Sequence, residues 1–392
     1  MRLLFYSDVE VFGGHEVTVL DAIEGAAMVP GVSIGVAYCK RNRMLGNHLM
    51  NRFGAFPMVE MLPHDFVHEA GDLLRAFVPS GKRRAIAGFI SGWRPDVVVV
   101  CQGHMGVSIC GLAAAVGTDA CVISYIPMAH TLREMTGGRS LTVRIVDALL
   151  ARAYRWPAIY LTIDACVAEQ LKSKHGVDNR RIHVIEYGPD LERLQRVSRD
   201  VARANLGLGG EFFIGMVGRV DFRQKGHDIV LDAIARRGGL PGDTRLVIVG
   251  DGPDSQRARS FVKDHGLDTF VRFLPWCDNV SSVYSALDLL LLPSRYEGAP
   301  IVMLEAMFFG LPVIASDVDG MRTVLPDDWR FAPGYGDQFM HVLDRVRHGS
   351  DPGLLERHKQ YIIKTRNAAH FRERIGAFVK DLCGSSFKGL RC

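Results

Sequence analysis

The sequence predicts two doubly wound α/β domains, each built on a parallel sheet. The first observation is length, because 392 residues exceed the roughly 250–300 at which one hydrophobic core stops growing. The second is a repeated pattern of a short apolar run, a turn and a helix-length amphipathic segment, which is typical of alternating strands and helices. The third is a polar stretch, residues 188–210, between two complete sets of such units.

Short apolar runs have the length and composition of buried parallel strands. In the first half these runs are Leu3–Tyr6, Val32–Val36, Val97–Val100, Cys121–Tyr125 and Ile159–Ile163. In the second half they are Phe212–Val217, Arg245–Val249, Phe270–Phe273, Leu287–Leu292 and Pro312–Ala315. Between them, segments such as 224–236 and 253–263 are predicted helices, and the chain from Pro352 onward is predicted to be helical without another strand.

These runs divide the chain into domains. We expect residues 1–195 to form the first domain, residues 205–370 the second, and residues 371–392 a helical tail. The sequence leaves open whether that tail crosses back to the first domain. Ligands of doubly wound sheets bind beyond the carboxyl ends of the strands, so two facing sheets predict a site in a central cleft between them.

The composition is that of a globular protein with a large core, since 48% of the residues are apolar and 23% are charged. The net charge of +4 does not indicate a nucleic-acid partner. No apolar run approaches the ~20 residues that span a bilayer. The amino terminus turns polar at Ser7 and predicts a strand rather than a signal peptide. We therefore expect a cytoplasmic protein, with the inner face of the cell membrane as a peripheral alternative.

The cysteines do not form a C-x-x-C pair, and most lie in apolar runs, so buried reduced thiols are expected rather than a zinc site or disulfides. They are Cys39, Cys101, Cys110, Cys121, Cys166, Cys277, Cys383 and Cys392.

The strongest motif is the segment 289–320, in which an apolar strand is followed by Glu297, a helix with Pro300 suited to its first turn, and Glu305. A helix amino terminus attracts a diphosphate. Carboxylates accept hydrogen bonds from vicinal hydroxyls, so the pair suggests a sugar on each side of that diphosphate. The alternative is that Glu297 caps the helix and Glu305 is a surface charge.

Two cations support the first interpretation. Arg219 and Lys225 follow the strand that ends at Gly218, and cations in that place suit phosphate neutralisation. Taken alone they could equally be surface charges. A glycine turn at 250–252 follows another strand, but Ser255 replaces the third glycine of a dinucleotide fingerprint.

The motifs GRVDFRQKG, VGDGP, Glu297/Glu305 and GLPVIASDVDG, in this order and spacing, resemble the retaining GT-B nucleotide-sugar glycosyltransferases of the group 1 and family 4 type. The resemblance implies two Rossmann-like domains. It also implies a hexosyltransferase that moves a sugar to a glycan or lipid-linked acceptor with retention of configuration, in polysaccharide biosynthesis of the cell envelope. By matched position, the catalytic residues are Arg219, Lys225, Glu297 and His130, and the donor-binding residues are Gly13, Gly14, Gly298, Ala299, Pro300, Ile301, Val302 and Glu305.

The first domain carries a looser resemblance. Gly13, Gly14 and Glu16 are similar to the family's Gly-Gly-x-Glu turn, where the glycine backbone approaches the donor phosphates. His130 follows a strand where the family often has a histidine near the transferred sugar, and a structural or surface residue is the alternative. The chain departs from the family pattern at Tyr187, Pro189, Arg322 and Thr323.

No cofactor or metal is expected beyond the nucleotide-sugar co-substrate, because Arg219, Lys225 and a helix end can stabilise the leaving diphosphate. Asp317 and Asp319 form a D-x-D sequence, which in another glycosyltransferase fold holds a divalent metal, but no partner motif supports that role here. Three alternatives remain: a nucleotide-sugar epimerase, a non-catalytic sugar-nucleotide-binding scaffold and, least favoured, a nicotinamide dehydrogenase.

A basic segment offers a further hypothesis. Between Lys40 and Arg94 there are nine cationic residues and four acidic ones, with apolar residues such as Met44, Met50 and Trp93 interleaved. A basic amphipathic helix can lie on an anionic membrane, so an anionic membrane surface is a candidate partner. An ordinary solvated helix packed on the first domain is the equal alternative.

Overall fold

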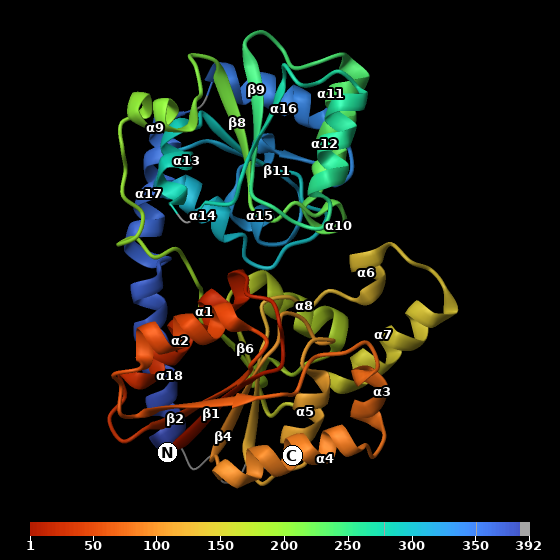
Figure 1. The fold of residues 1–392 in the computed structure, drawn as a ribbon, viewed down its shortest axis with the longest axis vertical. Coiled ribbons are helices and arrows are strands. Elements are labelled where there is room, and N and C mark those ends of the chain that lie inside the picture. Colours follow the sequence, from red (N-terminus) through yellow and green to blue (C-terminus); the bar gives the residue numbers. More distant parts are fainter. Residues whose placement is uncertain (278, 350, 385–392) are drawn as a thin grey trace. The chain divides into compact units, whose positions relative to one another are not determined.

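The computed structural model describes residues 1–277, 279–349 and 351–384. Close contacts divide the chain into two units: Met1–Tyr187 together with the segment that begins at Ala368, and Gly188–Asn367. Each unit is an α/β domain with one parallel sheet (Figure 1). The sequence predicts divisions at 195–205 and at 370, whereas close contacts divide the chain after Tyr187 and after Asn367.

The first sheet has seven strands in the order β3-β2-β1-β4-β5-β6-β7, all parallel. The strands are β1 Arg2–Ser7, β2 Ser33–Cys39, β3 Val59–His64, β4 Val97–Cys101, β5 Cys121–Tyr125, β6 Ile159–Thr162 and β7 Ile182–Val184. The five predicted strands are confirmed. The predicted apolar runs include neither β3, whose half-buried residues, with Pro63 among them, form no continuous apolar run, nor the three-residue β7.

Helices cover both faces of this sheet, with α1 and α2 on one face and α3, α4 and α5 on the other (Figure 1). The helices of the first unit are α1 Gly14–Ala27, α2 Arg43–Phe53, α3 Asp72–Phe77, α4 Gly81–Trp93, α5 Ile109–Val116, α6 Leu132–Thr136, α7 Leu141–Ala153, α8 Ala165–His175 and α18 Ala368–Gly384. The last of these, α18, packs against α1, so the tail of the chain completes the first unit.

The second sheet has six parallel strands in the order β10-β9-β8-β11-β12-β13. They are β8 Phe212–Val217, β9 Thr244–Val249, β10 Val271–Leu274, β11 Leu289–Leu292, β12 Val313–Ser316 and β13 Arg330–Phe331. The five predicted strands are confirmed, and only the two-residue β13 was not predicted. The strands of this parallel sheet are buried on both faces, so Leu, Ile and Val side chains fill the core of the second unit.

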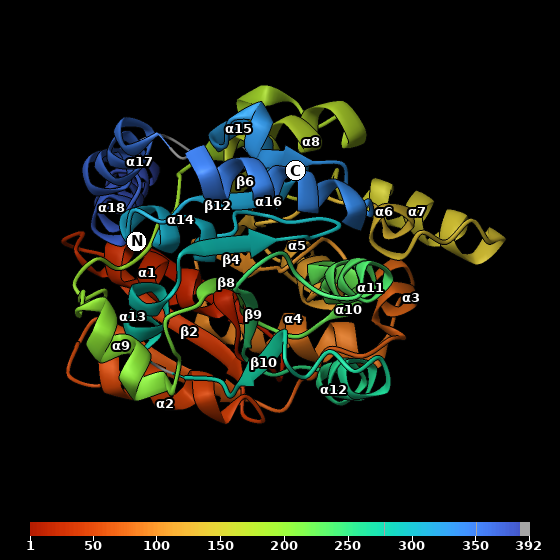
Figure 2. The same cartoon turned by 90° about the horizontal axis from the view of Figure 1, so that it is seen from above.

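The helices of the second unit flank its sheet, with α11 and α12 side by side on one side and α13 and α14 on the other (Figures 1 and 2). They are α9 Arg199–Leu206, α10 Phe222–Lys225, α11 His227–Arg237, α12 Ser255–Asp264, α13 Val280–Ala286, α14 Ile301–Phe308, α15 Asp319–Val324, α16 Gly336–Gly349 and α17 Pro352–Thr365. The helical end of the chain, predicted from Pro352 onward, is confirmed by α17 and α18.

One predicted helix is wrong in its bounds. The segment 224–236 is not one helix, because the chain breaks at Gly226, which has φ +69°. A β-carbon at Gly226 would lie 2.2 Å from the carbonyl oxygen of Pro293. Only glycine allows both this backbone angle and this approach. The break therefore ends α10 at Lys225 and brings that residue beside the loop that follows β11.

None of the helices in the described part of the chain is long and apolar enough to span a bilayer. The described cysteines are free thiols, three of them buried, three partly buried and Cys383 exposed. The exposure of Cys383 corrects the expectation of a buried thiol, because the last turn of α18 lies on the surface. Cys392 lies outside the described residues.

Candidate active site

The strand order of the second sheet reverses between β8 and β11, which are neighbours. At such a reversal the two following loops diverge to opposite faces and leave a crevice at the carboxyl edge of the sheet. Arg219 and Lys225 follow β8, and Glu297 follows β11. The predicted polar residues therefore lie where a doubly wound sheet binds its ligand.

Lys225 and Glu297 form an ion pair. The Lys225 Nζ atom lies 2.7 Å from Oε1 of Glu297. Ser294 donates a hydrogen bond of 2.7 Å to the same oxygen. The Glu297 backbone N–H donates to Oδ2 of Asp319 at 2.7 Å. Since Glu297 is only 4% exposed, its carboxylate depends on Lys225 and Ser294 for its charge to be tolerated.

Arg219 lies in the loop between β8 and α10, and its side chain is more exposed than that of Lys225. Its Nη2 atom lies 3.0 Å from Oδ2 of Asp221 and donates to Oε1 of Gln224 at 2.9 Å. Half of the Arg219 side chain is exposed to solvent. These partners orient the guanidinium without enclosing it, so it can still take an anionic ligand.

A second salt bridge, which the sequence did not predict, joins the loop after β11 to the segment that contains α10 and the start of α11. Arg295 binds Asp228 of α11 through two hydrogen bonds of 2.8 Å. Its backbone N–H also donates to the carbonyl of Gln224 at 2.8 Å. This planar, two-point contact holds the β11 loop against the start of α11. Arg295 thereby helps to hold Lys225 beside Glu297.

Glu305 lies in α14 and contacts a different group. Tyr284 of α13 donates a 2.7 Å hydrogen bond to Oε2 of Glu305. Burial raises the pKa of the Glu305 carboxyl to about 7, and the hydrogen bond from Tyr284 opposes that rise. Glu305 is therefore a partly buried, hydrogen-bonded group and not a plain surface charge.

The start of α14 differs slightly from the prediction. Pro300 is the residue before the helix, not part of its first turn, because its ψ of 93° is not helical. The helix begins at Ile301 and has no side-chain cap, so Glu297 does not cap it. The backbone N–H groups of Ile301 and Val302 lie in the first turn, where no helical acceptor exists. Gly298 and Ala299 complete the loop that leads to this amino terminus.

A cavity of about 610 Å³ opens at the same edge of the second sheet. It is lined by Gly250 and Gly252 after β9, by Trp276 after β10, and by Arg259 of α12. The Trp276 indole is 64% exposed. A β-carbon at Gly250 would lie 2.2 Å from the carbonyl of Gly218, so the glycine turn lets the ends of β8 and β9 approach closely.

The two aspartates of the D-x-D sequence have separate partners. Asp317 forms ion pairs with Arg322 and Arg330, whereas Asp319 accepts the backbone N–H of Glu297. Asp319 has a φ of +46°, an uncommon angle for a residue other than glycine. The described residues contain no cluster of three or more metal-ligating side chains. Asp319 thus acts on the position of Glu297.

In the first unit, Gly13 immediately precedes α1. Its N–H donates to Oε2 of Glu16 at 2.8 Å, and burial raises the pKa of Glu16 to about 7. The sequence did not single out the intervening His15. Its ring packs 5.4 Å from that of Tyr125, and burial lowers its pKa to about 4. The imidazole is therefore neutral at physiological pH.

His130 lies in the loop between β5 and α6, as the sequence predicts, and is buried. Its Nε2 atom lies 3.4 Å from Nε2 of Gln170 of α8. The neighbouring carbonyl of Ala129 lies 2.7 Å from Nε2 of His175. These contacts anchor the loop on α8 and are compatible with the structural alternative for His130 as well as with a functional role.

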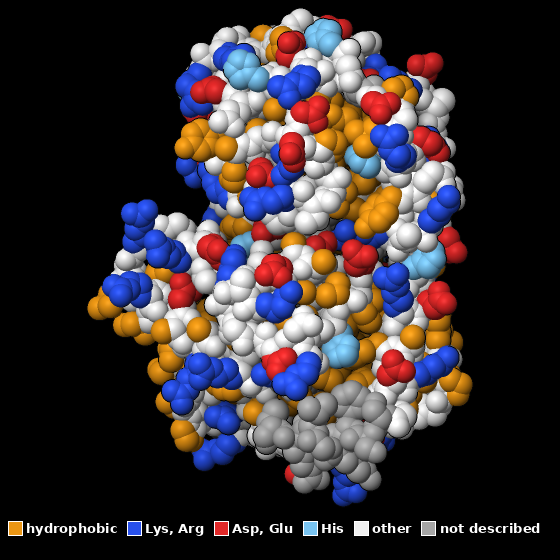
Figure 3. All heavy atoms as spheres, turned by 180° about the vertical axis from the view of Figure 1, so that it is seen from behind, with side chains coloured by type: hydrophobic (Ala, Val, Ile, Leu, Met, Phe, Trp, Pro, Cys, Tyr) orange, Lys and Arg blue, Asp and Glu red, His pale blue; other side chains and the backbone are white. Residues whose placement is uncertain are grey.

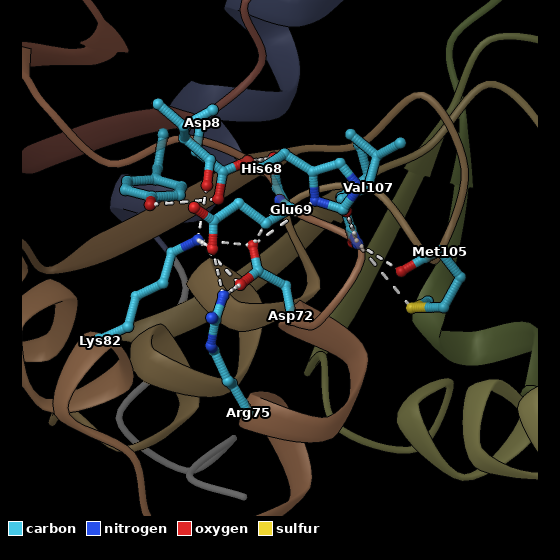
Figure 4. Close-up of polar contacts among 12 residues, drawn as sticks. Asp8, His68, Glu69, Asp72, Arg75, Lys82, Met105 and Val107 are labelled. Carbon is cyan, nitrogen blue, oxygen red and sulfur yellow. Dashed lines mark hydrogen bonds and ion pairs between the residues drawn. The ribbon is translucent and has the colours of Figure 1, made fainter.

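A charged cluster that the sequence did not reveal lies near the carboxyl end of β1 (Figure 4). The buried Asp8 accepts a 2.7 Å hydrogen bond from Ser108, and burial raises its pKa. Next to it, Asp72 pairs with Lys82 at 2.7 Å and with Arg75 at 3.0 Å. Burial of Asp72 acts to raise its pKa, but the hydrogen bond from Lys82 helps to hold it below its ordinary value.

This cluster changes the interpretation of the basic segment between Lys40 and Arg94. Five of its nine cations form ion pairs within the first unit: Lys40, Arg41, Arg52, Arg75 and Lys82. The apolar residues Leu45, Leu49, Phe53, Ile86, Ile90 and Trp93 are buried, whereas Met44 and Met50 are exposed. Much of the segment therefore packs as ordinary surface helix, and its contact with a membrane stays a prediction.

Comparisons with known proteins give matches in both units. Residues 12–193 match the family model described as Glycosyltransferase Family 4, and residues 211–346 match the model described as Glycosyl transferases group 1. The D-inositol 3-phosphate glycosyltransferase of Streptomyces bingchenggensis is 31% identical over 337 residues, which cover 78% of this chain and 70% of that relative.

The corresponding protein of Rhodococcus erythropolis is 34% identical, but the match spans only 50% of this chain and 48% of that relative. Thus the chain matches about half the length of several of these curated relatives. Among solved structures, Anabaena Alr3699/HepE in complex with UDP and glucose superposes with a TM-score of 0.74 at 17% identity, over 97% of this chain and 100% of that one. This likeness shows a shared fold.

Proposed function

Because the chain belongs to the GT-B glycosyltransferases of the group 1 and family 4 type, we propose that it transfers a sugar from a nucleotide-diphosphate sugar to a glycan or lipid-linked acceptor. The observation that carries the proposal is the placement of Arg219, Lys225 and Glu297 at the carboxyl ends of β8 and β11. Two cations beside a buried carboxylate suit a ligand that joins a diphosphate to a sugar.

Each donor group has a proposed partner. Arg219 and Lys225 bind the diphosphate, with the unpaired amides at the start of α14, and neutralise the charge that develops as it leaves. Glu297 contacts the transferred sugar, and Glu305 accepts hydrogen bonds from the ribose hydroxyls. The cavity beside Trp276 has room for the base, and the exposed indole offers a face for stacking. Gly298 and Ala299 shape the loop around the sugar, and the backbone of Gly13 and Gly14 approaches the phosphates.

We further propose retention of configuration and a reaction without a metal cofactor. Retention follows from the family resemblance alone. Independence from metal is supported by Arg219, Lys225 and the α14 terminus, which together can offset the leaving-group charge. His130 is proposed to contact the transferred sugar from the first domain. Arg322 and Thr323 depart from the family pattern, and Arg322 here pairs with Asp317.

The test is a panel of UDP-, GDP- and ADP-sugars, assayed for nucleoside diphosphate release with and without acceptors. The HepE structures contain UDP or UDP-glucose, so UDP-sugars head the panel. Relatives named for D-inositol 3-phosphate and 2-deoxystreptamine justify soluble cyclitols beside lipid-linked glycans as acceptors. Acceptor-dependent release and a glycosylated product are expected. Binding of every donor without release would leave the scaffold alternative, and epimerised donor without acceptor would indicate an epimerase.

A further inference from the structure

The outward face of α7 combines apolar and basic side chains along one stripe. Leu141, Ile145, Ala148 and Arg152 are spaced by three or four residues, so they lie on one face of the helix. All four are exposed, with Leu141 at 70% and Ile145 at 52%. Exposed leucine and isoleucine on the same helical stripe are not explained by packing within the domain.

The basic half of this stripe ends in a cavity of about 570 Å³. Arg152, Arg155 and Lys174 line it, beside the Trp156 ring. Lys174 pairs with Glu134 at 2.6 Å. Within the described part of the chain, the guanidinium groups of Arg152 and Arg155 have no hydrogen-bond or ion-pair partner. Two unpaired guanidinium groups at a cavity of this size fit a phosphate.

The charge around α7 is also one-sided. Residues 131–156 contain five arginines and two acidic residues. Both acids are engaged: Glu134 accepts from Lys174, and Asp147 accepts backbone N–H groups of Leu132 and Arg133. The exposed charges on this surface are therefore basic. Figure 3 shows blue basic and orange apolar side chains together on the projection at its left, which α6 and α7 form.

We propose that the α7 face, defined as Leu141, Arg144, Ile145, Arg152 and Arg155, docks on an anionic phospholipid surface. Leu141 and Ile145 enter the boundary between headgroups and acyl chains, while Arg152 and Arg155 take a lipid phosphate into the cavity. Apolar and cationic side chains on one stripe are complementary to such a bilayer, whereas a soluble phosphate would use only the arginines. The inference rests on the proposed function, because membrane binding would bring the enzyme to a lipid-linked acceptor.

Flotation of the full chain with vesicles tests this inference. We expect binding to vesicles with about one-third phosphatidylglycerol and little binding to phosphatidylcholine alone. Arg152→Ser/Arg155→Ser should lower the partition constant about twenty-five-fold, since each cation near an anionic surface contributes about a factor of five. Leu141→Ser/Ile145→Ser should lower it at least about tenfold. The double variant Arg236→Ser/Arg237→Ser on α11 removes the same charge elsewhere and should bind like the unmodified protein.

Three results would overturn the inference. The first is that the protein binds neither kind of vesicle. The second is that the α11 control loses as much vesicle binding as the α7 variants. The third is that Leu141→Ser/Ile145→Ser floats like the unmodified protein while inorganic phosphate displaces the protein fully from the vesicles. The last would indicate a soluble phosphate site. Thermal shift by nucleoside diphosphates, measured on the same variants, separates this inference from the proposed function. Loss of that shift in every protein would count against the donor site alone, and its retention in the α7 variants shows that they remain folded.

Discussion

The ammonium group of Lys225 lies 2.7 Å from Oε1 of Glu297, in a site where the carboxylate is almost fully buried. The two residues are 72 positions apart and follow neighbouring strands of one sheet. Gly226 makes the contact possible, because its backbone lies against Pro293 at the end of β11. The pair therefore links the proposed donor site to the local stability of the second domain.

Lys225→Ala and Arg219→Ala should each lower turnover about tenfold to a hundredfold. Each removes a charge-assisted contact to the leaving diphosphate, which contributes roughly 1.5–3 kcal/mol. The measurement is nucleoside diphosphate release under saturating donor. Arg237→Ala on α11, an exposed arginine outside the site, is the control. Full turnover in both site variants would disprove the assignment.

The stability of the second domain should also respond to this pair. Lys225→Ala leaves the carboxylate of Glu297 buried without its cation and should cost about 3 kcal/mol of unfolding free energy. Adding Glu297→Gln removes the orphaned charge and should restore part of that loss. Urea titration of the single and double variants measures both effects. No gain from the second change would mean that solvent already reaches Glu297.

Donor affinity should fall as the pH drops through about 7, the pKa to which burial raises Glu305. Only the ionised carboxylate accepts hydrogen bonds with both oxygens, so affinity should weaken about tenfold for each pH unit below that pKa. Glu305→Ala should weaken binding at every pH, and Glu305→Gln should flatten the profile. Calorimetry with a nucleotide sugar, which has no phosphate that titrates near neutrality, tests this. If Glu305→Gln kept the steep pH profile of donor affinity, the titration would belong to another group. Glu356→Gln on α17 is the control.

Activity should survive exhaustive treatment with EDTA, because cationic side chains and a helix terminus offset the charge of the leaving group. Asp317 is paired with Arg322 and Arg330, and Asp319 holds the Glu297 backbone. The assay compares turnover before chelation, after it, and after magnesium or manganese is returned. Loss on chelation with recovery on return of the metal would make both aspartates candidate ligands.

His130→Ala should leave nucleoside diphosphate binding nearly intact and lower transfer at least about tenfold, the effect of one lost hydrogen bond to the sugar. Since His130 is buried beside Gln170, the melting temperature must be measured alongside. His341→Ala, an exposed residue of α16, is the control. Normal transfer by the variant, or a loss explained by unfolding, would make His130 a structural residue.

The sequence predicted what depends on local pattern. Buried parallel strands are continuous apolar runs, so β8 and β11 were evident, and polar residues directly after them identified Lys225 and Glu297. It did not predict β3, which is partly exposed and contains Pro63. The break at Gly226 was also missed, because its cause is a close approach to Pro293, 67 residues away by number.

The residues that position the site were the least predictable. Tyr284 lies within α13, and no local pattern connects its hydroxyl with Glu305 on another helix. Arg295 and Asp228 resemble ordinary surface charges until the fold brings them together. The Asp317-x-Asp319 motif even suggested a different chemistry, although its two carboxylates act on separate partners. Such contacts are set by tertiary packing rather than by propensity or periodicity.

The return of α18 to the first unit has a consequence for biosynthesis. The ribosome delivers residues 1–187 first, yet α1 receives its packing partner only after the entire second unit has been synthesised. In the finished protein Arg372 pairs with Asp21 at 3.0 Å, and a β-carbon on Gly25 would lie 2.4 Å from the Arg372 carbonyl. During synthesis, the side of α1 that faces α18 therefore stays uncovered until α18 has been made. The second unit is continuous in sequence and can fold as it emerges. Synthesis of α18, rather than of the first half of the chain, therefore completes the packing of α1.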